Sequence, residues 1–187
     1  MHIEIATVQD TKAIHDIYKP YVEKTNITFE YDVPSVEIMQ QRIVSTLKMY
    51  PYLVAKIDEQ VVGYAYASAY KERRAYDWGC ELSVYVDEKY HRHGIAKALY
   101  YALLEILKQM NIQTVYACLT YPNEKSEKFH KSFGFIQIAL FEKSGYKFNQ
   151  WHDMIWMQKK LGNYQEVKEV IRFSQLDIKS VEACLKK

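Results

Sequence analysis

The residues with the clearest chemical potential form a short turn in front of a predicted amphipathic helix. The turn reads His91-Arg92-His93-Gly94-Ile95-Ala96 and follows a strand predicted from Cys80 to Val86. A helix start carries unpaired amide N–H groups and a partial positive charge, and small residues at Gly94 and Ala96 let an anion approach the backbone. The turn therefore suits a pyrophosphate, although a glycine that only relieves backbone strain explains the spacing equally well.

Other ligand sites do not fit this turn. The chain lacks the G-x-x-x-x-G-K-[ST] pattern of a P-loop, and no G-x-G-x-x-G follows its first predicted strand. His91 and His93 stand two residues apart, but no third ligand follows at a spacing typical of a zinc site. We therefore expect no bound metal.

The bulk composition limits the class of protein. With 187 residues, of which 49% are hydrophobic, the chain is long enough for one domain with a substantial core. Its 25 basic and 23 acidic residues give a net charge of +2, so we expect no nucleic-acid partner. No run approaches the about 18 apolar residues that span a membrane, and the three distant cysteines suggest reduced thiols. We expect a cytoplasmic protein without a membrane partner.

The hydrophobic periodicity predicts a mixed α/β fold. Alternating and helical spacings give the order β-α-α-β-β-β-α-β-α-β-β. The turn opens a helix predicted from Lys97 to Met110, and a later helix runs from Asn123 to Phe133 and is closed by Gly134. Two last strands, predicted at 136–141 and 154–158, are expected to be joined by a long loop.

Composition changes near residue 161. We expect 1–161 to form the domain and 162–187 to be a charged, lysine-rich extension. Within the extension, Val167, Val170 and Ile171 predict one more helix that packs on the outside. We expect no chemistry from it.

Several short segments, taken in order, resemble the GNAT family of N-acetyltransferases, and within it the phosphinothricin acetyltransferase branch. The family motif is Arg/Gln-x-x-Gly-x-Gly/Ala, and here His91 takes its first position, which weakens a side-chain contact but leaves the amide cradle intact. The resemblance extends to about Leu161. The segments that resemble the family are Thr28-Phe29-Glu30, Tyr52-Leu53-Val54-Ala55, Ala75-Tyr76-Asp77-Trp78, Glu81, Val84-Tyr85-Val86, Pro122-Asn123, Gly134-Phe135, Gly145-Tyr146-Lys147 and Trp151-His152-Asp153.

The resemblance implies a fold and a cofactor. The fold is a central, mostly antiparallel sheet that is splayed in the middle and flanked by helices, and the cofactor is acetyl-coenzyme A. A homodimer is frequent in the family. The implied cofactor-binding residues are Val84, Tyr85, Val86, His91, Arg92, His93, Gly94, Ile95, Ala96, Lys97, Asn123 and Ser126.

The resemblance also implies catalytic and acceptor-binding residues. Glu81 is the implied general base, acting directly or through water, whereas a lone strand glutamate is otherwise typical of a solvent-facing or salt-bridged position. His130 is the implied acid, and a structural hydrogen bond on its helix is the alternative. The implied acceptor-binding residues are Phe29, Arg73, Tyr76, Tyr146 and His152.

These expectations together predict an enzyme. It transfers acetyl from acetyl-coenzyme A to the amine of a small amino-acid-like acceptor, of the phosphinothricin, methionine sulfone or methionine sulfoximine type, by direct attack in a ternary complex. Two alternatives stay open. One is a coenzyme A binding or sensing module without catalysis, and the other is an acetyltransferase that acts on a protein amine.

Overall fold

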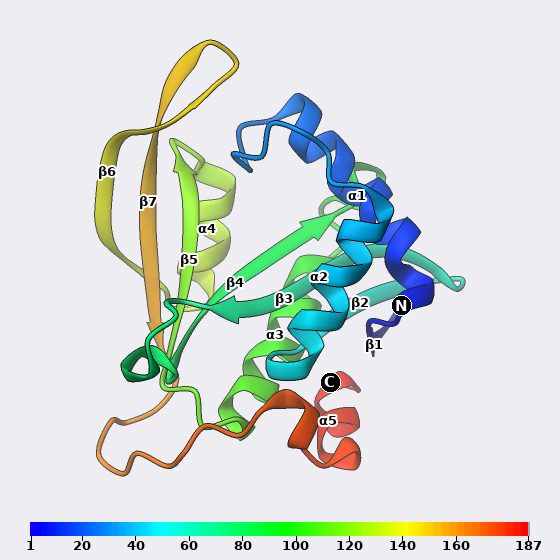
Figure 1. Ribbon diagram of the computed structural model, residues 1–187, viewed down its shortest axis with the longest axis vertical. Helices are drawn as coiled ribbons and strands as arrows, with labels where there is room; N and C mark the ends of the chain where they lie inside the picture. The colour runs from blue at the N-terminus through cyan, green and yellow to red at the C-terminus, as the bar shows by residue number, and fades with distance from the viewer. Residues whose placement is uncertain (187) are drawn as a thin grey trace.

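The computed structural model describes residues 1–186 and shows one seven-stranded sheet with the order β1-β2-β3-β4-β5-β7-β6 (Figure 1). The strands are β1 His2–Ile5, β2 Tyr52–Ile57, β3 Gln60–Ala69, β4 Gly79–Val86, β5 Thr114–Tyr121, β6 Ile136–Lys147 and β7 Gln150–Lys160. The helices are α1 Thr11–Lys24, α2 Val36–Met49, α3 Ile95–Gln109, α4 Glu124–Ser132 and α5 Ile178–Leu185. The predicted order of elements is confirmed, with α5 added at its end.

The sheet divides at β4 and β5. All other neighbouring strands are antiparallel, whereas β4 and β5 are parallel and pair only at Gly79–Thr114, Cys80–Val115 and Glu81–Tyr116. Beyond these three pairs the two strands diverge like the arms of a V (Figure 1). The mostly antiparallel, splayed sheet implied by the resemblance is confirmed.

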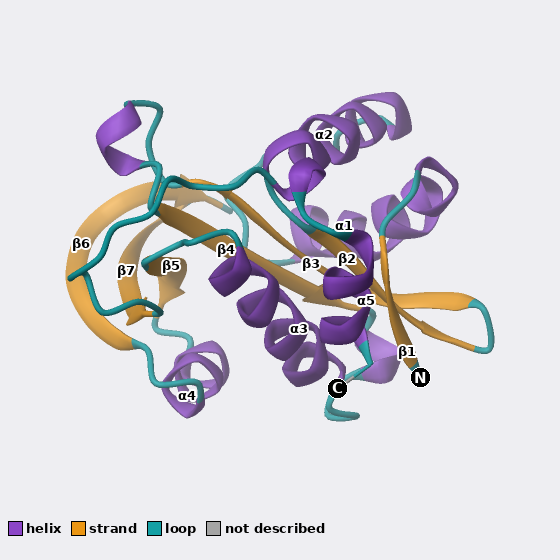
Figure 2. Cartoon of the chain, turned by 90° about the horizontal axis from the view of Figure 1, so that it is seen from below, coloured by secondary structure: helices purple, strands orange, loops and turns teal. Residues whose placement is uncertain are grey.

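Helices cover both faces of the sheet. Helices α1 and α2 lie on one face, and α3 and α4 lie on the other (Figure 2). The apolar residues of α3 recur at helical spacing, so Leu99, Leu103, Ile106 and Leu107 are all fully buried against the sheet. Burial from both sides explains why the first four residues of β2 are all buried instead of alternating.

The start of α3 lies unusually close to the sheet. A Cβ atom at Gly63 of β3 would come within 3.0 Å of Ile95 Cγ2 and 3.1 Å of the Tyr85 carbonyl oxygen. A side chain at this position would therefore push the N-terminus of α3 away from β4. Gly63 fixes the distance between the glycine turn and the splayed strand.

The last two strands are longer than the sequence indicated. The stretch expected as a long loop continues both strands, and β6 and β7 meet at Phe148 and Asn149, each with a positive φ. Most residues of β6 are exposed, and the pairing shifts register between Phe141 and Gly145, so no clean alternation marks this hairpin. The prediction of a long loop was wrong for that reason.

The C-terminal extension also differs from its prediction. Residues 167–171 are irregular, because backbone and side-chain bonds tie this stretch to its neighbours: Trp78 Nε1 donates to the Lys168 carbonyl at 2.7 Å and the Ile171 amide to the Met110 carbonyl at 3.1 Å. The helix forms later, as α5. Phe173, Val181 and Cys184 are buried in the same hydrophobic cluster as α3, so this part of the extension does not pack on the outside. Division of the chain at residue 161 stays a prediction.

Candidate active site

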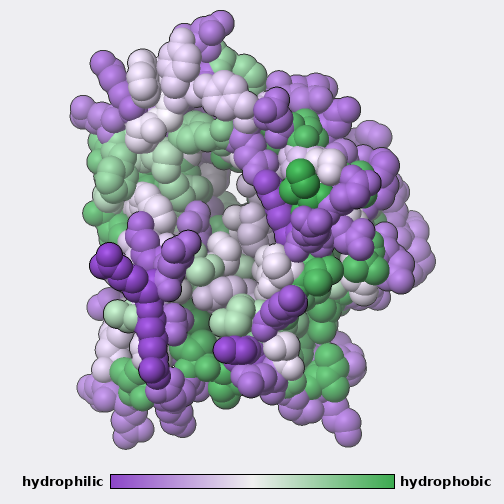
Figure 3. Space-filling model, in the orientation of Figure 1, coloured by the Kyte–Doolittle hydropathy of each residue, from purple (hydrophilic) through white to green (hydrophobic). Residues whose placement is uncertain are grey.

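A pocket of about 70 Å³ lies where β4 and β5 diverge. It is lined by Ile27, Leu82, Ser83, Val84, Tyr85, Tyr100, Cys118, Leu119, Thr120, Asn123, Ser126 and His130. These residues come from both arms of the V, from α3 and α4 on one face and from the α1–α2 loop on the other. In the space-filling view the surface is hollowed at this place (Figure 3). The pocket therefore runs between the two faces of the sheet.

The free edge of β4 presents backbone groups to this pocket. The Asp87 amide bonds to the Val62 carbonyl of β3, whereas both backbone groups of Val86 bond to the Tyr21 hydroxyl on the other side. Strand geometry alternates these directions, so the N–H and C=O of Val84 point to the open edge where β5 has diverged. An extended ligand arm can pair with them as another strand would.

The glycine turn lies at the start of α3 as predicted. Gly94 adopts φ +78°, in the left-handed region, and Arg92 does so at +67°. Helices α2 and α4 begin with side-chain caps from Ser35 and Asn123, but no side chain caps α3. A Cβ at Gly94 would meet no atom within 4 Å. The first-turn amides thus face open space, which fits a pyrophosphate.

The remaining residues of the turn divide by exposure. His91, Arg92, His93 and Lys97 are exposed, whereas Ile95 is buried beneath the helix start. His91 Nε2 lies 3.1 Å from the Val86 carbonyl, so its ring links the turn to the end of β4. No group of three histidine, cysteine or acidic side chains that would hold a metal occurs among residues 1–186.

His130 is fully engaged in hydrogen bonds. Its Nδ1 lies 2.8 Å from the Ser126 carbonyl, which only accepts, so Nδ1 carries the hydrogen and Nε2 accepts from the Tyr100 hydroxyl at 3.0 Å. Burial lowers the pKa of His130 below its ordinary value, and the bond to Ser126 opposes that shift. The imidazole is therefore neutral near pH 7. The helical hydrogen bond, kept above as the alternative, is present.

Tyr100 is a pocket residue that the sequence did not reveal. Its side chain is completely buried, burial raises its pKa, and its hydroxyl reaches the pocket together with His130. The only signal in the sequence was a tyrosine within the apolar stripe of α3, where core aliphatic residues predominate. Asn123 and Ser126 also line the pocket, and the Asn123 carboxamide oxygen accepts from the Ser126 amide at 3.2 Å.

Glu81 lies at the vertex of the V. It belongs to the last of the three residue pairs that join β4 to β5, and it faces Ser68 on β3. Burial raises the pKa of the Glu81 carboxyl above its ordinary value, and the Lys71 ammonium opposes the shift. A half-buried carboxylate with a raised pKa is better matched to accept a proton near neutrality than an exposed one.

Two predicted acceptor residues, Phe29 and His152, meet where the β6–β7 hairpin covers the α1–α2 loop. The rings of Phe29 and His152 lie 6.0 Å apart, and the Tyr146 carbonyl accepts a hydrogen bond from the Tyr31 hydroxyl. The Phe29 ring occupies the space beside Gly145 so closely that a Cβ there would lie 2.2 Å from it. Phe29 and His152 thus form one group at the open end of the V, whereas the Tyr146 ring packs on Trp151 on the opposite face of the hairpin, because side chains alternate along β6.

A buried lysine fixes this group. Lys147 Nζ donates to the carbonyls of Val22, Thr25 and Thr28 at 2.7, 2.9 and 2.8 Å, and so satisfies the C-terminal end of α1 and the loop after it. Burial lowers the pKa of Lys147, and the charge of Glu30 opposes this. The resemblance included Lys147, but no sequence pattern showed that it would join these segments.

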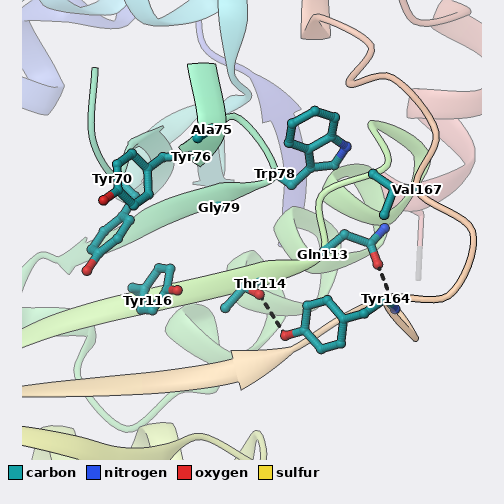
Figure 4. A pocket seen from close by; sticks show the side chains of 10 residues that line it. All are labelled: Tyr70, Ala75, Tyr76, Trp78, Gly79, Gln113, Thr114, Tyr116, Tyr164 and Val167. Atoms are coloured by element: carbon teal, nitrogen blue, oxygen red, sulfur yellow. Dashed lines mark hydrogen bonds between the residues drawn. The ribbon is translucent and has the colours of Figure 1, made fainter. Parts of the chain in front are cut away.

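The other two predicted acceptor residues lie at the vertex end, on the loop between β3 and β4. Tyr76 lines an aromatic pocket of about 240 Å³ there, and Arg73 is exposed three residues earlier (Figure 4). The structure therefore places Phe29 and His152 at the open end of the V and Arg73 and Tyr76 at its vertex, while the Tyr146 ring lies apart on the other face of the hairpin. Glu81 stands beside the vertex group.

Comparisons with known proteins agree with this geometry. Residues 3–156 match the model of the acetyltransferase (GNAT) domain. The chain is 31% identical over 159 residues to the phosphinothricin N-acetyltransferase of Streptomyces viridochromogenes, covering 85% of this chain and 87% of that protein. It is 27% identical over 165 residues to the L-methionine sulfoximine/L-methionine sulfone acetyltransferase of Salmonella typhimurium, covering 88% and 96%.

A solved structure agrees as well. The phosphinothricin acetyltransferase of Sinorhizobium meliloti, crystallised in complex with AcCoA, superposes with a TM-score of 0.87 at 30% identity, covering 92% of this chain and 96% of that chain. Among the described residues of the present chain, no helix has the length and apolar character to cross a membrane.

Proposed function

The chain belongs to the GNAT acetyltransferase family, and from that premise we propose that it transfers the acetyl group of acetyl-coenzyme A to the amine of a small amino-acid-like acceptor. The observation that carries the proposal is the pocket in the splayed sheet, together with Glu81 at the vertex of the V and the start of α3, which no side chain caps. Acceptors of the phosphinothricin, methionine sulfone and methionine sulfoximine type are supported by the named relatives.

The cofactor residues have separate tasks. The amides at the start of α3, with the turn from His91 to Lys97 around them, hold the pyrophosphate. The free edge of Val84 pairs with the extended arm, while Asn123 and Ser126 lie along the opposite wall. Acetyl-coenzyme A supplies a thioester carbonyl, which a backbone N–H of β4 polarises. Because both backbone groups of Val86 bond to Tyr21, Val84 is the donor we assign.

Proton transfer uses groups on both sides of the pocket. Glu81 accepts the proton of the attacking ammonium, directly or through water, because burial raises the pKa of its carboxyl. Tyr100 and His130 form a hydrogen-bonded pair on the far side. Neutral His130 holds the Tyr100 hydroxyl through Nε2; when that hydroxyl turns to the departing thiolate it gives the sulfur its proton, and the phenolate is reprotonated from solvent.

The assembly and location are also part of the proposal. Four exposed apolar side chains on the edge strand β6, Ile136, Ile138, Leu140 and Phe141, support a homodimer. Cys80 and Cys118 form no disulfide, which supports a cytoplasmic location. Sedimentation analysis of the purified protein tests the dimer, and a monomer at all concentrations would contradict it.

A transfer assay tests the central claim. The protein is mixed with acetyl-coenzyme A and phosphinothricin, methionine sulfone, methionine sulfoximine or a panel of unrelated amines, and free thiol is followed over time. We expect release of free thiol with the amino-acid-like acceptors. Binding of acetyl-coenzyme A by calorimetry with no release for any amine would instead indicate a non-catalytic coenzyme A module, and release only with a protein amine would change the acceptor.

A further inference from the structure

The aromatic pocket at the vertex has an ordered floor. The rings of Tyr70 and Tyr116 stack with centroids 4.1 Å apart and an interplanar angle of 17°, and Tyr76 meets Tyr70 edge-on at 5.8 Å. Trp156 packs against both stacked rings at 5.3 and 6.1 Å. Such a floor offers flat, rigid apolar surface with little conformational freedom to lose on binding.

This pocket adjoins the proposed base. Glu81 is the register partner of Tyr116, and Gly79, two residues before Glu81 on the same face of β4, lines the pocket. Two residues of a strand span about 7 Å. An amine held at Glu81 therefore places a side chain of a few atoms into the pocket.

The C-terminal extension closes the opposite wall. Tyr164 and Val167 line the pocket, and the Tyr164 hydroxyl bonds to Thr114 Oγ1 at 2.8 Å (Figure 4). The extension is fastened here by the bond from Trp78 to the Lys168 carbonyl and by Asn111 Nδ2 donating to the Glu169 carbonyl at 2.8 Å. The family domain model ends at residue 156, so this wall lies outside it.

Tyr164 is held in an unfavourable backbone conformation. Its φ is +61°, in the left-handed region that large side chains avoid at a cost of about 1 kcal/mol. The ring is nevertheless 43% exposed, so burial in a core does not explain the strain. Tyr164 bonds to the pocket wall through the Thr114 hydroxyl and the Gln113 carboxamide oxygen, and Lys160 Nζ lies 5.4 Å from the centroid of its ring.

The Tyr164–Thr114 pair has one hydrogen-bond donor to spare. Two hydroxyls carry two hydrogens, and the bond between them uses one. The carboxamide of Gln113 is partly engaged, because one of its two N–H groups donates to the Asn111 carbonyl and its oxygen accepts from the Tyr164 amide. The hydroxyl pair has a donor that can recognise an oxygen at this end of the pocket.

Building on the proposed function, we propose that Tyr164 is a specificity-determining residue supplied by the C-terminal extension. The pocket receives the side chain of the acceptor, whose methylene stem lies on the Tyr70 and Tyr116 rings. A sulfonyl, sulfoximine or phosphinyl oxygen on this side chain accepts the hydrogen of the exposed Tyr164 hydroxyl, whose oxygen in turn accepts from the buried Thr114 hydroxyl. The wall thereby favours acceptors with an oxygen-bearing tip over those with the same stem and a bare apolar tip.

A matched pair of acceptors tests this directly. Methionine sulfone and norleucine have stems of similar length, but only the sulfone carries oxygens at the tip. We expect Tyr164→Phe to lower the ratio of kcat/KM for the sulfone to that for norleucine by about five- to tenfold, the effect of one hydrogen bond. Thr114→Val should act in the same direction but less strongly, because the Tyr164 donor remains and loses only the partner that orients it. KM for acetyl-coenzyme A should stay within about twofold, because both side chains lie outside the splayed pocket.

The controls separate this inference from the proposed function. Tyr101→Phe removes an exposed hydroxyl on α3 and should leave the ratio unchanged. An unchanged ratio in both Tyr164→Phe and Thr114→Val, with active wild-type enzyme, would overturn the role of Tyr164 alone. Absence of turnover by the wild-type protein for every amine would overturn the proposed function itself. Thermal melting of each variant establishes that it is folded.

Discussion

The cofactor side and the acceptor side of the site are built in different ways. The cofactor side comes largely from one continuous stretch, β4, the glycine turn and α3, and it offers mainly backbone groups to its ligand. The acceptor side combines the α1–α2 loop, the β3–β4 loop, the β6–β7 hairpin and the C-terminal extension, and it offers mainly side chains. Backbone recognition tolerates sequence change, whereas side-chain recognition allows the acceptor to vary within one fold.

Among the substitutions considered, one at the vertex, where the two sides meet, should lower activity the most. Glu81→Gln should lower kcat/KM by about 100-fold or more, since general bases contribute on that order, while the Kd for acetyl-coenzyme A stays within about twofold. The wild-type kcat/KM should rise with pH through the raised pKa of Glu81, because the protonated carboxyl cannot accept a proton. Steady-state kinetics over a range of pH measures both.

The control for Glu81 is Glu182→Gln on α5, an exposed carboxylate far from the vertex in the fold. It should leave the pH profile unchanged. If Glu81→Gln keeps the acid limb of the wild-type profile, another group is the base.

The next substitution should affect acetyl-coenzyme A binding and leave acceptor binding unchanged. Gly94→Ala should weaken acetyl-coenzyme A binding by about tenfold and lower the free energy of unfolding by about 1 kcal/mol, because an alanine at φ +78° is strained and its methyl group stands before the amide cradle. Calorimetric titration and chemical denaturation measure the two changes. KM for the acceptor should not change.

Gly134→Ala is the matched control for this backbone strain. Gly134 has φ +83° but lies at the end of α4, where the added methyl group would meet only Lys159 Nζ at 3.3 Å. We expect a similar loss of stability without loss of acetyl-coenzyme A affinity. Equal weakening of acetyl-coenzyme A binding in both variants would remove the argument for the cradle.

A third substitution should affect acceptor binding and leave acetyl-coenzyme A binding unchanged. Lys147→Met leaves three carbonyls at the end of α1 without their donor, so the free energy of unfolding should fall by about 3 kcal/mol. At temperatures where the variant is still folded, KM for the acceptor should rise by about fivefold, because the loop that carries Phe29 is no longer bonded to Lys147. The Kd for acetyl-coenzyme A should not change. Lys143→Met, at an exposed position of the same strand, should change neither.

The smallest effect concerns the Tyr100–His130 pair. Burial lowers the pKa of His130 in the folded state, so the unfolded chain binds the extra proton first and stability is lost as pH falls below about 6.5. The loss should grow progressively as pH falls from about 7 to about 5. His130→Gln should flatten this dependence, whereas His93→Gln, at an exposed position, should retain it. Equal slopes in all three proteins would contradict the engaged, neutral imidazole.

Prediction from the sequence succeeded where local signals are strong. The turn around Gly94 and the long apolar stripe of α3 were identified because helix periodicity and a left-handed glycine position are encoded by neighbouring residues. The β6–β7 hairpin was misjudged because its residues are exposed and its register shifts, which removes the alternation that marks a strand. A helix was predicted around residues 167–171, but these residues form a loop. A short run of apolar residues at helical spacing can therefore also belong to a loop that packs against neighbouring elements.

The sequence by itself determined the order of the elements and the helix start that suits a pyrophosphate, and the family resemblance added Glu81 as the candidate base. Only the tertiary structure showed that β4 and β5 part after three residue pairs, that Lys147 joins the hairpin to the end of α1, and that Tyr164 reaches Thr114. These contacts join residues 50 to 125 positions apart. The spacing of neighbouring residues does not predict these contacts, because they depend on how the whole sheet is packed.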